Sequence, residues 1–518
     1  MAQLDKIDSN VTGLRYQVET SIGVANASND WVPLEPNGYS DFGGQLTTIA
    51  RNPINAGRQR KKGVVTDLDA SGGFGTDLTQ ENMQDLLQSF MFAANREKGR
   101  EIVTLVDIDT TFPDEYQVAA TAGFLVGSLI IGKNFVNSAN NALNVVTAIV
   151  TDVSVEVATG QLVDETPPAD GEIFVVGVEA AADDIAVTTT GDYATYTSTL
   201  LDFTTLGLIP GEWIFVGGDV AGAAGDQFPT NAANNGYKRI KSIAANALVV
   251  DKSTTTIVTE TPAGGETIRF FFGRVLKNES DPTLQARQTV QLERTLGAPD
   301  DASPADIQAE YITGAVANEF SFNIPTADKL MCDLSFVGLD NAQISGPVAL
   351  KAGTRPALTE ADAFNTSSDF SRIKMNIHSE TSENPDALFA YVTELTLTIN
   401  NTLSPNKAVG VLGAFEVTAG QFVVNGNVTA YFSNVAAVAA VRNNSDVSID
   451  MHLSKANSGI SIDVPLIALG EGRLNVEQDA PITLPLSLDA ATAAKLDANM
   501  DHTLLIVFFD YLPDAADV

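Results

Sequence analysis

The side chains that most often carry out catalysis or bind metals are sparse in this chain of 518 residues. Its three histidines, His378, His452 and His502, are widely separated, and none belongs to an HExxH pattern. Cys332 is the single cysteine, so neither an intrachain disulfide nor a cysteine-based zinc site can form. The sequence contains no GxxxxGK(S/T) phosphate loop and no GxSxG nucleophile motif. We therefore predict no catalytic residue, no metal site and no cofactor.

Two pairs of aspartates, Asp67/Asp69 and Asp107/Asp109, have a spacing that places both carboxylates on one face of a strand. Among 65 Asp and Glu residues such pairs arise by chance, so we assign them no metal. The glycine-rich run SGGFG (71–75) is not surrounded by a strand-to-helix unit of the Rossmann type. We interpret it as a flexible turn.

A short basic run is the strongest candidate for a contact site. It consists of Arg58, Arg60, Lys61 and Lys62 in the sequence GRQRKKG. The run lies between two expected strands, 46–51 and 64–68, and so at the tip of a long hairpin or loop. Because the whole chain carries a formal charge of −35, this tip could dock on an acidic neighbouring subunit. A solvated tip without a partner is the alternative, and the sequence leaves both open.

The composition indicates a folded, mainly β protein with several domains. The chain is too long for one ordinary core, and 44% of its residues are hydrophobic, with Val, Ile and Thr prominent. The acidic balance disfavours a protein that grips nucleic acid, because phosphate binding depends on Lys and Arg. An acidic surface repels DNA, which is useful where DNA must pass without sticking, but it also simply keeps an abundant protein soluble.

Export and membrane signals are not found in the sequence. The N-terminal residues MAQLDKIDSN contain neither a basic region nor an apolar region, so no signal peptide is predicted. The apolar run LIVFF near the C-terminus has the length of a strand and not of a membrane span. We expect a chain that folds in a reducing cytoplasm and does not contact a membrane.

A clear repeat occupies the middle of the chain. Three anchors recur in the same order, with alternating apolar residues between them. They are Gly123 and Gly127 with Gly207 and Gly211, Asn140-Asn141 with Asn234-Asn235, and Glu165-Thr166-Pro167 with Glu260-Thr261-Pro262. Each copy reads as three or four short strands separated by turns. We predict two small β modules at 115–177 and 200–273, joined by residues 178–200.

A second, fainter duplication relates the two ends. LTTIARNPINAGR (46–58) aligns without gaps with LTLTINNTLSPNK (395–407). An apolar segment with helical spacing follows each copy. In the first, Asp77 is the expected cap of a helix whose buried stripe is Met83, Leu86, Leu87 and Phe90. In the second copy, Asn425-Gly426 reads either as a hairpin turn or as a kink within a strand.

Both ends of the chain resemble the major tail tube proteins of long-tailed phages. The resemblance lies in WVPLEPN (31–37) with the following DFGGQLTTIARNPINAGRQRKKG, in residues 393–432, and in ISIDVPLIALGEGRLNVEQDAP (460–481). It implies β-sandwich or barrel domains, each with one packed helix, that share sheets with neighbouring copies to form rings. Stacked rings would make the conduit for the genome in the virion tail. The small modules would be insertions.

The resemblance, together with the duplication, gives an expected organisation. Residues 1–114 and 274–355 would form a first tube domain, 115–177 and 178–273 the two modules with their linker, and 356–518 a second tube domain. Two tube domains in one chain favour rings of three chains with pseudo-sixfold symmetry, whereas one interrupted domain would give hexamers. Partners would be further copies and other tail proteins at the tube ends, and DNA would pass through without specific binding.

Two other functions remain open from the sequence. A secreted acidic β-rich surface protein or adhesin would share the composition, although the N-terminus shows no export signal. A carbohydrate-active enzyme would need paired acids in a groove lined by aromatic residues, but aromatic residues make up only 7% of this chain. Hollow tubes of uniform bore would distinguish a tail tube protein from both of these.

Overall fold

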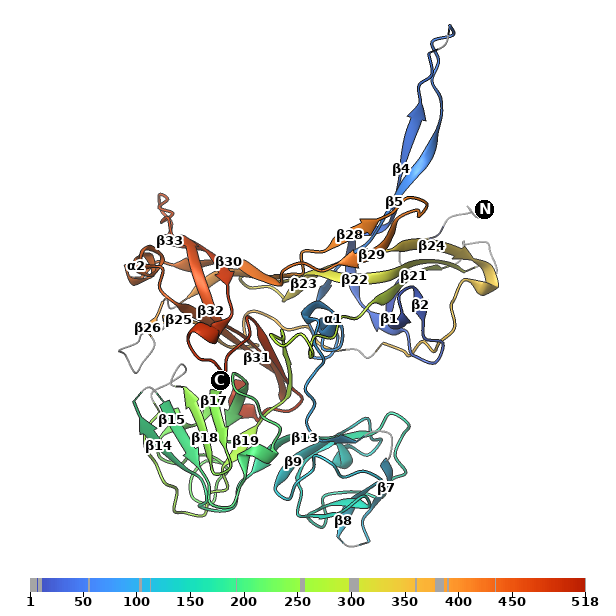
Figure 1. The fold of residues 1–518 in the computed structure, drawn as a ribbon. Coiled ribbons are helices and arrows are strands. Elements are labelled where there is room, and N and C mark those ends of the chain that lie inside the picture. Colours follow the sequence, from blue (N-terminus) through green and yellow to red (C-terminus); the bar gives the residue numbers. More distant parts are fainter. Residues whose placement is uncertain are drawn as a thin grey trace. The chain divides into compact units, whose positions relative to one another are not determined.

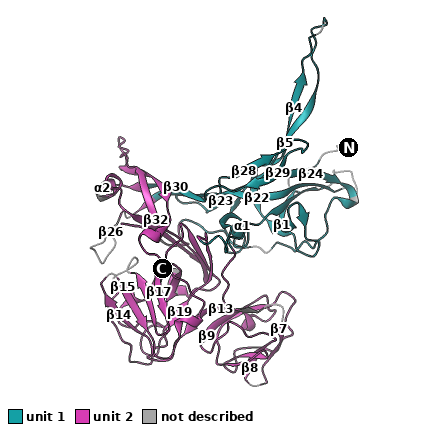
Figure 2. Ribbon diagram, viewed as in Figure 1, with its two compact units in different colours: residues 1–93, 281–366, 393–429 teal, residues 94–280, 367–392, 430–518 magenta. Residues whose placement is uncertain are grey.

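The computed structural model describes residues 7, 12–54, 56–101, 105–111, 113–191, 193–251, 257–297, 307–358, 361–377, 386–388, 391–433 and 435–517. The chain divides into two compact units (Figure 2). Unit 1 comprises residues 1–93, 281–366 and 393–429, and unit 2 comprises residues 94–280, 367–392 and 430–518. Strands dominate both units (Figure 1), so the predicted mainly β class is confirmed.

Unit 1 is built from long antiparallel strands and one short helix. Its elements are β1 (Gly13–Ser21), β2 (Val24–Ala25), β3 (Val32–Leu34), β4 (Pro36–Arg51), β5 (Lys61–Asp77), α1 (Leu86–Met91), β21 (Val290–Gly297), β22 (Gln308–Ile324), β23 (Met331–Gly338), β24 (Asp340–Ser345), η5 (Gly346–Val348), nearly all of β27 (Val392–Asn400), β28 (Ser404–Lys407), β29 (Ala414–Thr418) and most of β30 (Val423–Tyr431).

The long strand β22 belongs to two layers of unit 1. Its N-terminal half pairs with β21 and β24, and β21 pairs in turn with β1. Its C-terminal half pairs with β23 and β27, and β23 continues to β5 and β4. The change occurs at Gly314, whose φ of 60° and close approach to Leu339 leave no room for a side chain.

Helix α1 covers β22 with the stripe that the sequence predicted. Met83, Leu86, Leu87 and Phe90 are all buried, and the Phe90 ring lies 5.4 Å from the ring of Phe320. The expected cap is wrong, because Asp77 is the last residue of β5 and the helix begins only at Leu86. The intervening turn is instead closed by the side chains of Thr79 and Asn82, which bind each other's backbone N–H groups.

The glycine-rich run 71–75 is not a flexible turn. It lies inside β5, between the paired strands β4 and β23. A Cβ on Gly72 would collide with Leu292, and a Cβ on Gly75 would lie 2.8 Å from a carboxylate oxygen of Asp333. Gly426 likewise lies within β30, where a side chain would collide with the carbonyl of Thr396, so the strand reading is correct there. Glycine occupies these positions because neighbouring strands approach closely.

Unit 2 contains the central repeat and a C-terminal sheet. The elements of the repeat are β6 (Arg100–Glu101), β7 (Leu105–Asp109), β8 (Asp114–Val118), β9 (Ser128–Lys133), η2 (Ser138–Asn141), β10 (Leu143–Val145), β11 (Ala148–Val150), β12 (Ser154–Val157), β13 (Glu172–Glu179), β14 (Ala186–Thr190), β15 (Tyr193–Thr197), η3 (Phe203–Thr205), β16 (Trp213–Val216), η4 (Ala232–Asn234), β17 (Gly236–Ala244), β18 (Ala247–Asp251) and β19 (Arg269–Phe271). Those of the sheet are β20 (Arg274–Lys277), β25 (Phe370–Ile377), β26 (Asp386–Ala387), α2 (Ala436–Asn443), β31 (Val447–Lys455), β32 (Ser458–Glu471), β33 (Thr483–Ala490), η6 (Ala493–Lys495), β34 (Leu505–Phe509) and η7 (Asp514–Asp517).

The two halves of the central repeat have the same strand pairing. In the first, β7 pairs with β8, β8 with β12, β12 with β11, and β9 with β10 and β13. In the second, β14 pairs with β15, β15 with β18, β18 with β17, and β16 with β17 and β19. Strands β14 and β15 lie in residues 178–200, which we expected to be a linker. The alternation AVTTT and YATYT around the Gly191 turn forms a hairpin there.

A buried asparagine organises the first half of the repeat. The side-chain amide of Asn140 donates a 2.9 Å hydrogen bond to Glu165, and its side-chain oxygen accepts one from the backbone N–H of Val163. The Tyr116 hydroxyl donates to the backbone carbonyl of Asn140. The side chain and the backbone of this one residue therefore join three segments that are distant in sequence.

The second half contains the same arrangement. Asn234 donates a 2.7 Å hydrogen bond to Glu260 and accepts one from the N–H of Val258, and the Tyr196 hydroxyl donates to the carbonyl of Asn234. The Asn and Glu anchors found in the sequence therefore hold equivalent positions in the two halves. They recur because Asn140 and Asn234 are fully buried, so their side-chain amides need partners within the protein.

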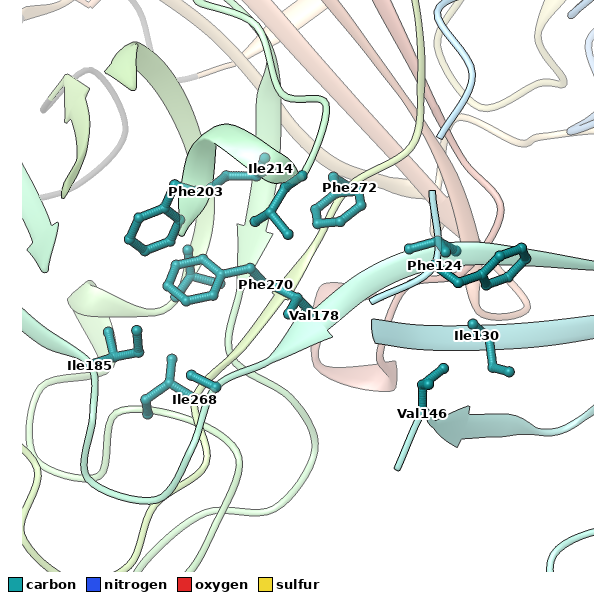
Figure 3. Close-up of a cluster of buried hydrophobic side chains, with 14 of the residues drawn as sticks. Phe124, Ile130, Val146, Val178, Ile185, Phe203, Ile214, Ile268, Phe270 and Phe272 are labelled. Atoms are coloured by element: carbon teal, nitrogen blue, oxygen red, sulfur yellow. The ribbon is translucent and has the colours of Figure 1, made fainter. Parts of the chain in front are cut away.

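One hydrophobic core extends through both halves of the repeat. Figure 3 shows Phe270 beside Phe203 and Ile268, and Ile130 beside Val146. The halves are joined where β13 pairs with β19, from Gly177↔Phe271 to Glu179↔Arg269. The apolar residues that alternate along these short strands thus supply a continuous interior.

A buried ion pair fixes the second half of the repeat to the C-terminal sheet. The Arg239 guanidinium in β17 donates to Asp251 at 2.6 Å and to Asp463 of β32 at 3.3 Å, and it lies 5.8 Å from the Trp213 ring. Burial raises the pKa of the Asp463 carboxyl to about 7. Removing the Arg239 guanidinium would therefore be costly, because the buried Asp463 carboxyl would lose its cation.

The C-terminal sheet of unit 2 repeats the connectivity of unit 1. β25 pairs with β31, β31 with β32, and β32 with β33 and β34. In the same order, β1 pairs with β21, β21 with β22, and β22 with β23 and β24. Helix α2 packs on β32 as α1 packs on β22, and its residues Ala437 and Ala440 are buried.

The two units do not follow the expected domain boundaries. Residues 393–429 belong to unit 1, because β27 pairs with β22. The gapless alignment of 46–58 with 395–407 does not follow the structure either: Arg58 lies in the turn after β4, whereas Lys407 lies in the additional strand β28. Strand pairing depends on partners elsewhere in the chain, and local similarity does not contain them.

Candidate assembly surface

The β4–β5 hairpin is the largest projecting feature of unit 1. Its two strands are registered from Pro36↔Thr76 to Arg51↔Lys61, with irregularities that include one at Thr47/Thr48. Figure 1 shows its outer part extending away from the other strands of unit 1. From residue 44 to the tip, the described residues of β4 are exposed on both faces of the ribbon. An isolated two-stranded ribbon of this kind is marginally stable in water, so a partner surface is expected.

The predicted basic run lies at the tip of this hairpin. Arg58 has a left-handed φ of 53° in the turn, and Lys61 and Lys62 begin β5. All four side chains of the run are exposed. Residues 42–66 contain five Lys and Arg residues and no acid, although the chain as a whole carries −35. The tip is therefore a cationic projection on an anionic protein.

Apolar side chains accompany the basic residues along the same hairpin. Ile49 pairs across the ribbon with Val64, and each is more than half exposed. Further exposed apolar residues of the hairpin are Leu46, Ile54 and Val65. Exposed apolar groups that gather on one projecting element mark a surface for another protein. We define the assembly hairpin as residues 42–66.

A second, shorter hairpin supports the base of the first. Its strands β28 and β29 pair from Ser404↔Thr418 to Lys407↔Ala414. The Lys407 ammonium contacts a carboxylate oxygen of Asp67 and one of Asp69, each at 2.5 Å. The hydrogen bond from Lys407 holds the pKa of the Asp67 carboxyl below its usual value, and the same bonds raise the pKa of Lys407.

The aspartate pair of β5 thus has a lysine partner, which sequence reasoning missed. The alignment of 46–58 with 395–407 was the available signal, since it singled out Lys407. It could not show that residues more than 300 positions apart meet. Exposed apolar residues occur on this second hairpin too, among them Val409, Leu412 and Phe415.

Of the other residues considered for chemistry, His452, His502 and Cys332 lie in packed surroundings. His452 is buried in β31, with Nδ1 2.7 Å from the Ser461 hydroxyl, and burial lowers the pKa of His502 to about 3. His378 lies outside the described residues. Cys332 is buried in β23, where burial raises the pKa of its thiol. Asp109 binds the backbone and hydroxyl of Thr111.

Within the described residues, no group of three or more His, Cys, Asp or Glu side chains is arranged to hold a metal ion. Over the same residues, no helix is both long enough and apolar enough to span a membrane.

The comparison with known proteins agrees with the resemblance seen in the sequence. A family model described as phage tail tube protein matches residues 9–490. No curated protein matches the chain. The family match extends across both units and the central repeat, and the mainly β fold agrees with it. The chain therefore belongs to the phage tail tube protein family and is a structural component of the virion tail.

Proposed function

We propose that this protein polymerises into stacked rings that form the tail tube, the conduit through which the phage genome is ejected into the host. Assembly would take place in the host cytoplasm, with other tail proteins at the two tube ends. The observation that carries the proposal is the connectivity that occurs twice. The order β1, β21, β22, β23 and β24 in unit 1 recurs as β25, β31, β32, β33 and β34, each with a helix on the long central strand.

The duplicated connectivity supports a ring of three chains. Each chain would contribute two tube-type domains, so that three chains give six similar positions around the axis. A chain with a single interrupted domain would instead need six copies. Closed rings of identical chains arise when a head-to-tail contact has a rotation that closes.

The assembly hairpin is suited to connect one ring with the next. It carries five cations and several exposed apolar residues on a chain of charge −35. A projecting cationic element approaching an acidic neighbour gains attraction that acts within a Debye length of roughly 8 Å at physiological salt. Single exposed ion pairs are worth only about 0–1 kcal/mol, but they repeat around every ring. The contact would fix the register between rings.

Electron microscopy of the purified protein tests the proposed function. We expect hollow tubes of uniform bore, or stacked rings with threefold symmetry when averaged. Discrete rings with true sixfold symmetry and one chain in each position would show that the ring is a hexamer and not a trimer. A protein that stays monomeric at every concentration and salt condition, alone and in the presence of its tail partners, would contradict polymerisation.

A further inference from the structure

Unit 1 contains an internal junction between two tube-type sheets. Residues 319–324 of β22 pair with residues 395–400 of β27 in antiparallel register. The side-chain amide of Asn400 donates a 2.7 Å hydrogen bond to Glu319 at one end of this junction. β27 follows β25 in the chain and leads through β30 to α2, so it belongs to the second copy. The junction therefore joins the long strand of the first copy to a strand of the second.

The junction segment of β22 has a counterpart at the end of β32. Residues 319–324 read EFSFNI, and residues 471–476 read EGRLNV. The hairpins that follow the two segments support this correspondence independently of the amino-acid sequence. Asn323 pairs with the first residue of β23, and Asn475 pairs with the first residue of β33. Both hairpins therefore have the same length. Their registers agree at this end and differ by one residue at Glu471, which pairs with Leu486 whereas Glu319 pairs with Ser335, because Glu471 and Gly472 form a bulge with φ of 62° and 80°.

The two matching segments differ in burial. Phe322 and Ile324 in the junction are 2% and 6% exposed, whereas Leu474 and Val476 at the equivalent positions are 37% and 67% exposed. On the edge of β32 that corresponds to the junction, pairing with β31 ends at Ile467. Within the described residues, no strand is registered against that edge beyond this point. The segment that contains Leu474 and Val476 therefore has the apolar pattern of the junction but, among the described residues, no partner strand on this edge.

The first copy offers the complementary edge. Strands β4 and β5 of the first copy correspond to β27 and β30 of the second, because β5 and β30 each lead into a helix. Leu78, directly after β5, donates to the residue before β23, and Phe432, directly after β30, donates to the residue before β33. Counting back from these matched bonds places the counterpart of residues 395–400 within residues 40–47 of β4. Among the described residues, β4 is registered only against β5.

We propose that residues 473–476 of one chain, beyond the bulge at Glu471 and Gly472, pair with residues 40–47 of β4 in a second copy of the same chain, antiparallel, as β22 pairs with β27. This inference rests on the proposed ring and names the contact that closes it. Each chain then has one free edge of each kind, so the contact is head to tail. Backbone hydrogen bonds would supply the association, and burial of Leu474 and Val476 would add to it.

Disulfide trapping between chains tests the pairing. Arg473, the counterpart of Ser321, is replaced by cysteine, together with one cysteine in β4 in each of five variants: Asp41→Cys, Phe42→Cys, Gly44→Cys, Gln45→Cys or Leu46→Cys. Opposed residues in antiparallel strands lie within the distance that a disulfide spans. After mild oxidation of assembled protein we expect covalent trimers in at least one variant and none with Arg473→Cys alone. The matched control is Ser321→Cys with Thr398→Cys, a pair registered within one chain, which should give only an intrachain disulfide.

The outcomes separate the edge pairing from the ring itself. Rings in the microscope without interchain disulfides in any variant would overturn the pairing and leave the proposed function standing. An absence of rings in the unmodified protein would instead remove the proposed function. As a second measurement, Arg473→Pro should abolish ring formation by removing a backbone donor from the edge. Arg473→Ser should assemble normally, and assembly of both variants alike would contradict the proposal.

Discussion

The side-chain amide of Asn234 donates a 2.7 Å hydrogen bond to the Glu260 carboxylate, and both residues are buried. The same asparagine accepts the N–H of Val258. Asn234→Ala should therefore destabilise unit 2 by about 2–3 kcal/mol, because the Glu260 carboxylate loses one of its donors and the N–H of Val258 loses its acceptor together. Urea unfolding monitored by tryptophan fluorescence measures the loss. Asn246→Ala, in an exposed turn, is the control and should change stability by less than about 0.5 kcal/mol.

Arg239 provides a second stability prediction. Arg239→Met should lower the unfolding free energy of unit 2 by about 3–5 kcal/mol, because Asp463 would remain buried without its cation. Chemical denaturation of the variant measures the change. Arg442→Met, an exposed arginine at the end of α2, serves as the control and should be nearly neutral. Equal stability of the two variants would show that water or another cation compensates Asp463.

The contact of Lys407 with Asp67 has a pH dependence of defined sign. The pKa of Asp67 is lowered, so its contribution is present above the ordinary value of 3.8 and is lost as pH falls through the folded value. The pKa of Lys407 is raised above 10.5, so its contribution is present below that value and is lost at higher pH.

Lys407→Met should therefore move the titration midpoint of Asp67 upward toward 3.8, as carboxyl NMR would measure. Lys329→Met removes a lysine that pairs with Asp77 instead and should leave Asp67 unchanged. An unaltered Asp67 midpoint in the Lys407 variant would mean that the ion pair does not persist in solution.

The basic run predicts a selective defect in assembly. Replacing Arg58, Arg60, Lys61 and Lys62 by Ser should leave monomers folded but impair tube polymerisation, most visibly at low salt, where the charge attraction of the unmodified run is least screened. Sedimentation and negative-stain microscopy measure the assembled fraction. The control exchanges Arg and Lys at the same four positions, which keeps the charge. Normal tubes from the Ser variant would show that the run is merely a solvated turn.

The bore of the assembled tube should be predominantly acidic. Duplex DNA carries about one negative charge per 1.7 Å of its axis, so a basic wall would hold it through many phosphate contacts. A repulsive wall lets DNA pass without sticking. The electrostatic potential calculated on a reconstructed tube checks this, and a largely positive lining would refute it.

The sequence alone determined the class of the protein and its repeats. Alternating apolar residues and turn signals predicted a mainly β fold, and the family resemblance is confirmed by the family match. The anchors Asn140 and Glu165, with their counterparts Asn234 and Glu260, were visible because buried polar networks demand particular side chains at fixed spacings. The stripe that α1 buries was visible for the same local reason, since helical periodicity resides within a few turns.

Tertiary structure alone decided where strands find their partners. The run 71–75 looks like a turn in isolation, but β23 and β4 on either side turn it into the middle of a strand. Residues 393–429 join unit 1 because β22 accepts β27 at its edge. The meeting of Lys407 with Asp67 depends on the same long-range pairing. A strand carries its alternation in its own residues, but the identity of its neighbour is set by hydrogen bonds to segments hundreds of residues away.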